Sequence, residues 1–149
     1  MAQQTAAHPN VKVVEEMYNC FARGDMESLK REVFAQNLVW HLPGRHPLAG
    51  DKKSPDEVIA FFGQLIKSNI TVDLVSIDGT DTAVYEVHRG YTPKDRPGVG
   101  LDALNCTVYQ IRDGKIAEVQ VFLSDQHAAD NFFNANYQLK PIPDRLASQ

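Results

Sequence analysis

The chain of 149 residues lacks the features that mark several large classes of protein. It holds no uninterrupted apolar run near the ~20 residues that a membrane-spanning helix requires. Its 15 basic and 19 acidic residues include no cluster of lysine and arginine, and the formal net charge of −4 disfavours a nucleic-acid-binding surface. We therefore expect neither a membrane nor a nucleic acid among its partners.

Cysteine is scarce, with Cys20 and Cys106 far apart in apolar surroundings. Such isolated thiols are typical of reduced core residues in a cytosolic protein and not of a disulfide. Residues 1–10 also lack the charged head and apolar block of a signal peptide. The sequence therefore predicts a cytoplasmic location.

Motifs for metals, phosphates and covalent catalysis are missing as well. The five histidines are scattered without the spacing of metal ligands. The chain has neither a glycine-rich phosphate loop nor a nucleophile elbow. The sequence therefore predicts no metal and no cofactor.

The residues that are present predict helices first and strands last. Asn10 is a helix cap before an apolar stripe that runs to about Arg23, and Asp25 is the cap of a second helix. Ser54, followed by proline and then glutamate, forms a complete capping box for a helix over 55–67. A short final helix is expected after Asp125.

Period-two alternation predicts strands near 37–42, 70–77, 82–91, 101–111 and 116–123. This order is typical of an α+β fold with helices packed on one face of a mainly antiparallel sheet. We expect a flexible arm over residues 1–9, one domain over 10–136 and an irregular tail over 137–149.

Four short motifs follow one another in a recognisable order. They are Ala-Arg-Gly-Asp-Met after the first helix, Trp-His-Leu-Pro-Gly and Leu-Ala-Gly after the first strand, and Tyr-Gln-Ile-Arg-Asp-Gly-Lys-Ile near the end. This order resembles the ketosteroid-isomerase-like, polyketide-cyclase-like (SnoaL-like) superfamily, also named after nuclear transport factor 2, over about residues 10–136. The resemblance implies a curved sheet and helices that form a cone with the site inside. This fold hosts isomerases, cyclases, dehydratases and plain binding proteins.

The resemblance also places the catalytic positions of ketosteroid isomerases on this chain. Their general-base aspartate precedes a proline that matches Pro43, so Leu42 takes the place of the base. Their oxyanion-hole tyrosine matches Met17, beside Tyr18, and their protonated acid falls near Thr107. Because leucine cannot move a proton, we expect no steroid isomerisation.

The cone is expected between the helix over 55–67 and the concave sheet face. Asn105 shares a strand face with Thr107, and the two would orient a carbonyl or hydroxyl group in an apolar wall. With Tyr18 and His41 they form the candidate catalytic set. The expected ligand-binding residues are Trp40, Leu42, His46, Phe61, Phe62, Leu65, Tyr85, Val119 and Val121.

Two of these histidines have alternative interpretations. His41 is a candidate general base, but strand alternation places it opposite Leu42, so only one of the two faces the cone. His46 either closes over a ligand or is a solvated loop residue. Tyr85 and His88 must also face opposite ways.

Two functional hypotheses remain open. The first is a protein that binds a small, mostly apolar cyclic, polyketide-like or isoprenoid-like ligand and catalyses cofactor-free cyclisation, isomerisation or dehydration. The second is a non-catalytic binding or dimerisation module. A homodimer is expected through the uncovered sheet face, because that face carries too many apolar residues to remain in water. The residues assigned to it are Val84, Glu86, His88, Leu104, Cys106, Val108, Glu118, Gln120 and Phe122.

Overall fold

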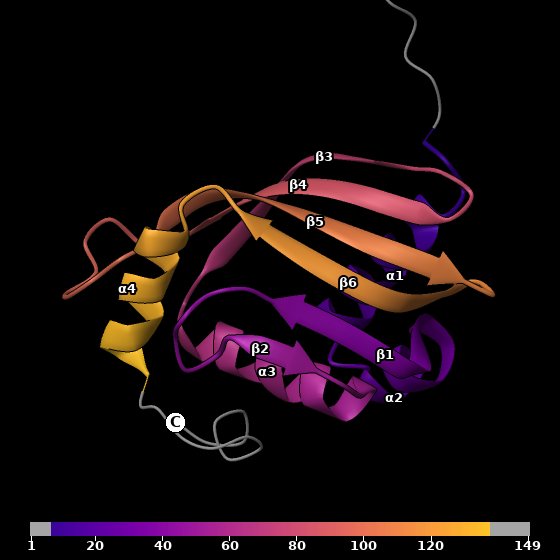
Figure 1. Ribbon diagram of the computed structural model, residues 1–149, viewed down its shortest axis with the longest axis horizontal. Helices are drawn as coiled ribbons and strands as arrows, with labels where there is room; N and C mark the ends of the chain where they lie inside the picture. The colour runs from indigo at the N-terminus through magenta and orange to yellow at the C-terminus, as the bar shows by residue number, and fades with distance from the viewer. Residues whose placement is uncertain (1–6, 138–149) are drawn as a thin grey trace, which may run out of the picture.

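A six-stranded sheet in the order β2-β1-β6-β5-β4-β3 organises residues 7–137, which are the part of the chain that the computed structural model describes. Helices lie against one side of this curved sheet, and α4 lies across one end of it (Figure 1). The predicted α+β cone fold is confirmed. The elements are α1 (Val11–Ala22), α2 (Met26–Ser28), a π-helical turn η1 (Leu29–Val33), β1 (Phe34–Leu42), β2 (Gly50–Lys52), α3 (Pro55–Lys67), β3 (Thr71–Gly79), β4 (Ala83–Tyr91), β5 (Asp102–Arg112), β6 (Lys115–Leu123) and α4 (Gln126–Asn136).

The helix starts follow the local signals in the sequence. The Ser54 hydroxyl accepts a hydrogen bond from the backbone N–H of Glu57 (3.1 Å), and the Asp125 carboxylate accepts one from Ala128 (3.0 Å). Both side chains satisfy an N–H group that has no partner within its own helix. No helix within residues 7–137 is long and apolar enough to cross a membrane.

The sheet is antiparallel except where β1 runs parallel to β6. β1 begins at Phe34, three residues before the expected start, because Phe34 already pairs with Ile116 of β6. β2 was not predicted, since its three residues are too few for an alternation pattern to show.

The cross-strand register corrects the predicted faces of β4. Glu86 lies opposite Thr107, and His88 lies opposite Asn105. Residues directly opposite each other in an antiparallel pair share a face, so Glu86 and His88 point into the cone. Their assignment to the uncovered face, together with Val84, is therefore wrong, and Tyr85 points outward instead.

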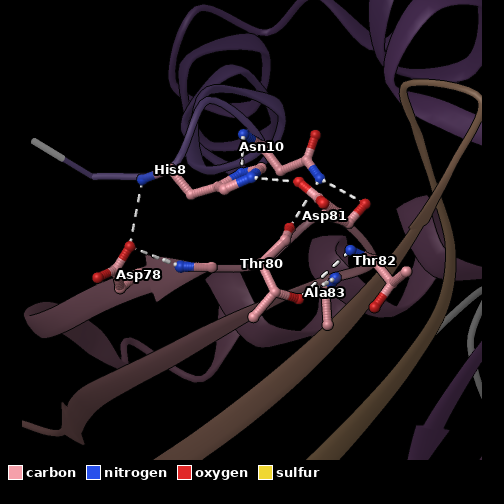
Figure 2. Close-up of polar contacts among 8 residues, drawn as sticks. His8, Asn10, Asp78, Thr80, Asp81, Thr82 and Ala83 are labelled. Atoms are coloured by element: carbon pink, nitrogen blue, oxygen red, sulfur yellow. Dashed lines mark hydrogen bonds and ion pairs between the residues drawn. The ribbon is translucent and has the colours of Figure 1, made fainter.

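The N-terminal segment is tied to the turn between β3 and β4 (Figure 2). The backbone N–H of His8 donates to Asp78 (3.2 Å), and the imidazole Nε2 of His8 lies 2.9 Å from an oxygen of Asp81. The Asn10 side chain donates to the backbone carbonyls of Thr80 (3.0 Å) and Asp81 (3.1 Å). Residues 1–6 of the predicted arm and 138–149 of the predicted tail lie outside the described residues.

Candidate functional site

A cavity of about 340 Å³ lies between helices α1 and α3 and the concave face of the sheet. This volume is in the range of pockets that hold small organic molecules. Most of its wall is aliphatic or aromatic. It is lined by Met17, Tyr18, Phe21, Trp40, Leu42, Phe61, Phe62, Leu65, Ile66, Ile70, Val72, His88, Gly90, Leu101, Ala103, Asn105, Thr107, Tyr109, Val121, Leu123, Ala129 and Phe133.

Aromatic rings pack edge-to-face to form one side of the cavity. The ring of Trp40 lies 5.0 Å from that of Phe62 and 5.9 Å from that of Tyr109, measured between ring centroids. Phe21 and Phe62 form a third edge-on pair at 5.0 Å. Such contacts favour offset geometry and hold the rings in defined positions, so this wall is a rigid apolar surface.

The polar part of the site is organised around the buried carboxylate of Glu86. The hydroxyls of Tyr18 and Tyr109 both donate to its Oε2, the latter at 3.2 Å. Its Oε1 lies 2.8 Å from Nδ1 of His88. The Glu86 side chain is fully buried, and burying a carboxylate is very costly unless hydrogen bonds satisfy it, as these contacts do.

The same contacts indicate which nitrogen of His88 carries the proton. An ionised carboxylate can only accept, so Nδ1 carries a proton and donates it to Glu86. In the neutral ring the lone pair then lies on Nε2. Within residues 7–137 no group of the protein bonds this Nε2, and His88 lines the cavity. The imidazole is thus oriented as a proton acceptor.

The two tyrosines stay protonated over the whole physiological range. Burial raises the pKa of the Tyr18 hydroxyl well above its usual range, and the nearby charge of Glu86 adds to the rise. Burial likewise raises the pKa of the Tyr109 hydroxyl, with further contributions from Tyr18 and Glu86. Both phenols therefore act as hydrogen-bond donors that hold the carboxylate in place.

Neutral polar groups lie beside the imidazole on β5. Asn105 is directly opposite His88, and Thr107 is opposite Glu86. The Oδ1 atom of Asn105 and the Nε1 atom of Trp40 are buried and make no hydrogen bond among the described residues. An unsatisfied buried polar group costs about 1–3 kcal/mol, so both are groups that a polar ligand atom would stabilise.

Most of the residues predicted for the site line this cavity. Tyr18, Asn105 and Thr107 do so among the candidate catalytic residues. Tyr18, however, donates to Glu86 and not to the open space. The ligand-binding candidates that lie in the wall are Trp40, Leu42, Phe61, Phe62, Leu65 and Val121.

Four predicted residues lie outside the cavity wall. His41 is on the outer sheet face, where its two nitrogens contact Asp51 (2.7 Å) and Glu118 (3.2 Å), because Leu42 takes the inner face. Tyr85 faces outward and is 48% exposed, and Val119 is buried in the core behind the wall.

His46 is neither solvated nor in contact with the cavity. Its ring is 4% exposed and stacks on Phe133 at 4.5 Å. Its loop is anchored on α4, where the Arg45 N–H donates to Asp130 (3.0 Å). A Cβ atom on Gly44, which has a positive φ of 123°, would lie 2.5 Å from Asp130, so only glycine fits. His46 thus supports Phe133, which lines the cavity.

The residues that sequence reasoning missed are Glu86, His88 and Tyr109. Glu86 and His88 are two residues apart on a strand, which places both on one face. That spacing is visible in the sequence, but the face that both residues share was assigned to the uncovered side of the sheet. Among residues 7–137, no group of three or more histidine, cysteine and acidic side chains is arranged to hold a metal ion.

A second hollow of about 540 Å³ lies beside the connection between β4 and β5. Both of its arginines are already engaged. Arg89 forms a two-pronged ion pair with Asp102 at 2.8 Å, and Arg96 donates to the Ser68 carbonyl and to Asn136, each at 2.7 Å. We therefore place the site in the cone and not here.

The fold and the cavity define a cone-shaped α+β protein with an apolar interior. The SnoaL-like domain family matches residues 14–119, and the chain belongs to this family, as its motifs predicted. An uncharacterized protein of Mycobacterium tuberculosis is 29% identical over 128 residues, which are 83% of this chain and 95% of that protein.

Solved structures show the same fold. Bal32a, from a soil-derived mobile gene cassette, superimposes with a TM-score of 0.73 and 30% identity over 83% of this chain and 95% of its own. TerC, co-crystallized with polyporic acid, superimposes with a TM-score of 0.67 and 15% identity over 84% of this chain and 98% of its own.

Proposed function

We propose that the protein binds a small, mostly apolar cyclic ligand in the cone and catalyses a cofactor-free proton transfer on it. The reaction class is isomerisation, cyclisation or dehydration next to a carbonyl group. The observation that carries the proposal is the imidazole of His88, which lines an apolar cavity while the buried Glu86 binds its Nδ1 at 2.8 Å.

The chemistry follows from this arrangement. Nε2 of His88 takes a proton from a carbon next to the ligand carbonyl, and the electrons of that C–H bond form the enolate. The imidazolium is stabilised by Glu86, while Asn105 and Thr107 offer hydrogen-bonding groups for the ligand oxygen. Return of the proton to a different carbon completes an isomerisation, and loss of a hydroxyl that takes up the proton completes a dehydration.

His88 takes over the task that the aspartate before the proline performs in ketosteroid isomerases. Leu42 lines the cavity in that place and makes its wall apolar. General-base assistance typically contributes ~100- to 10,000-fold in rate, and here a base on β4 would supply it. TerC, a protein of the same fold, was co-crystallized with polyporic acid. This supports a small organic molecule as the ligand.

The alternative is a binding protein without catalysis, which the leucine at the usual base position favours. The two functions are separated by deuterium exchange into 2-tetralone in heavy water, followed by proton NMR. This ketone is bicyclic and apolar, and its exchange needs only a base beside the carbonyl. We expect exchange above that of free imidazole, and a loss of at least ~100-fold in His88→Gln.

His127→Gln is the matched control, because His127 is an exposed histidine outside the cavity. This variant should exchange deuterium at the rate of the unchanged protein. Binding of 2-tetralone without any exchange would establish the alternative. Equal exchange by both histidine variants would show that His88 is not the base.

We further propose a homodimer through the outer sheet face. Leu104 and Phe122 are 50% and 54% exposed there, and Tyr85 adds a third large side chain at 48%. A large exposed apolar patch usually marks an interface. Light scattering should give twice the chain mass, and Leu104→Asp with Phe122→Asp should give the monomer. A monomeric native protein at micromolar concentration would refute this assembly.

A further inference from the structure

Large apolar side chains stay exposed at the mouth of the cavity. Ile66, at the end of α3, is 63% exposed, and Val72, at the start of β3, is 47% exposed, although both line the cavity. Leu74, the next inward-facing residue of β3, is 51% exposed. We call these three residues the apolar rim.

The rim continues the wall of the cavity outward. β3 is an edge strand, and its register places Val72 opposite Gly90 and Leu74 opposite His88. Cross-strand partners share a face, so Leu74 lies on the same inner face as His88. An apolar surface therefore leads from the proposed base out past the mouth.

Gly90 lies between His88 and the rim on the inner face of the sheet. It has no side chain, and a Cβ atom there would come into ordinary contact with Ile70 (3.6 Å) and Asn105 (3.7 Å) without a clash. Between Val72 and Ala103, its partners on the neighbouring strands, the sheet thus offers only backbone at Gly90. Gly90 itself lines the cavity, so the lining next to the rim carries no side chain at this position.

Three half-exposed aliphatic side chains next to one opening are unfavourable in water, and such patches commonly belong to binding grooves. We infer that the ligand is longer than the enclosed cavity. A cyclic, oxygen-bearing head lies beside His88, and an unbranched apolar extension, such as an alkyl or prenyl chain, leaves through the mouth and covers Ile66, Val72 and Leu74. This inference rests on the proposed function, because the head is the ligand proposed for the cone.

A series of 4-alkylphenols tests the inference directly. The phenol ring supplies the oxygen-bearing head, and the chain is lengthened from ethyl through butyl and hexyl to octyl. Binding is followed by the fluorescence of Trp40, which is the single tryptophan of the chain and lines the cavity. Each added methylene group should tighten binding on the order of threefold.

The double variant Ile66→Asp with Val72→Asp places charge on the rim at exposed positions, so folding should persist. We expect its affinity for 4-octylphenol to fall to near that for 4-butylphenol, so that the gain in affinity beyond the butyl chain is lost. Val99→Asp is the matched control, because Val99 is 43% exposed on the β4–β5 connection and does not line the cavity. This control should retain the full gain with chain length.

Each other outcome has a definite meaning. If the double variant keeps the full increase in affinity with chain length, or if affinities stop rising at short chains, the ligand has no apolar extension over the rim. Ligand binding in the cone would stand in either case. If the double variant has a changed mass in light scattering but unchanged affinities for the 4-alkylphenols, the rim is a contact between two copies of the chain. That result would overturn the inference. If none of the phenols binds, the proposed binding function and the inference both fail.

Discussion

Nδ1 of His88 lies 2.8 Å from Oε1 of Glu86, two residues away on the same strand, and Glu86 is fully buried. The pair places a charged acceptor behind an imidazole whose other nitrogen faces an apolar space. The acceptor fixes the tautomer and the orientation of the ring. This relationship distinguishes a cavity that can move a proton from one that can only bind.

Glu86→Gln should leave the protein folded and lower the exchange rate of 2-tetralone. The amide keeps an acceptor for hydrogen bonds but removes the charge that stabilises the imidazolium. We expect a fall of ~10-fold or more, measured by proton NMR at saturating ketone. An unchanged rate would show that the carboxylate only fills space.

Tyr109→Phe should destabilise the protein by about 1.5–3 kcal/mol, because it removes a buried hydrogen bond to a charged group. Urea unfolding measures the loss. Tyr91→Phe is the control, since its hydroxyl bonds Asp73 (3.0 Å) at an exposed site and should contribute far less. Equal losses in the two variants would contradict the role assigned to Tyr109.

The buried phenols also make stability depend on alkaline pH. Because their pKa values are raised in the folded state, the unfolded chain loses these protons first. Stability should be full below the ordinary tyrosine pKa of ~10 and fall as pH rises above it. In Tyr109→Phe the free energy of unfolding, measured with urea, should fall less steeply with pH across this range. The same slope as in the unchanged protein would contradict this prediction.

His41 should stabilise the fold more at acidic than at alkaline pH. Hydrogen bonding to Asp51 raises the pKa of its imidazole most, with Glu118 adding to the rise against the effect of burial. The stabilisation is then complete below the unfolded pKa of ~6.5 and is lost as pH rises through the higher folded pKa. The free-energy difference between the native protein and His41→Gln should therefore be larger near ~pH 5.5 than near ~pH 8.5 in urea unfolding. A difference that grows with pH would contradict the ion pairing.

Val121→Trp should abolish ligand binding while the protein stays folded. Val121 lines the cavity on β6, and the larger ring would occupy much of its space of about 340 Å³. Val119→Leu serves as a control for enlarging a buried side chain, because Val119 is buried behind the wall and does not line the cavity. Loss of 4-ethylphenol binding in Val121→Trp, with the circular dichroism spectrum retained, is the expected result.

Local signals were enough to predict much of the fold. Ser54 and Glu57 mark the start of α3 because a capping box involves only neighbouring residues. Strand alternation placed Leu42 and His41 on opposite faces, although it left open which of the two turns inward. Such patterns depend on a few adjacent side chains, so they can be recognised in the sequence.

The chemical centre could not be predicted in the same way. The inward direction of Glu86 and His88 depends on the pairing of β4 with β5 across a connection that contains two prolines, and sequence alone does not set that register. Burial of Glu86 depends on Tyr18 and Tyr109, which approach it from distant parts of the chain. A glutamate without known partners is ordinarily placed on the surface.

A crystal structure of the protein in complex with 2-naphthol tests the central claim most directly, because it shows where a cyclic ligand with a single oxygen binds. We predict the ring system against Trp40 and its oxygen within hydrogen-bonding distance, ~2.6–3.2 Å, of Nε2 of His88. A naphthol oxygen that contacts only groups away from His88, or a naphthol bound outside the cone, would contradict it.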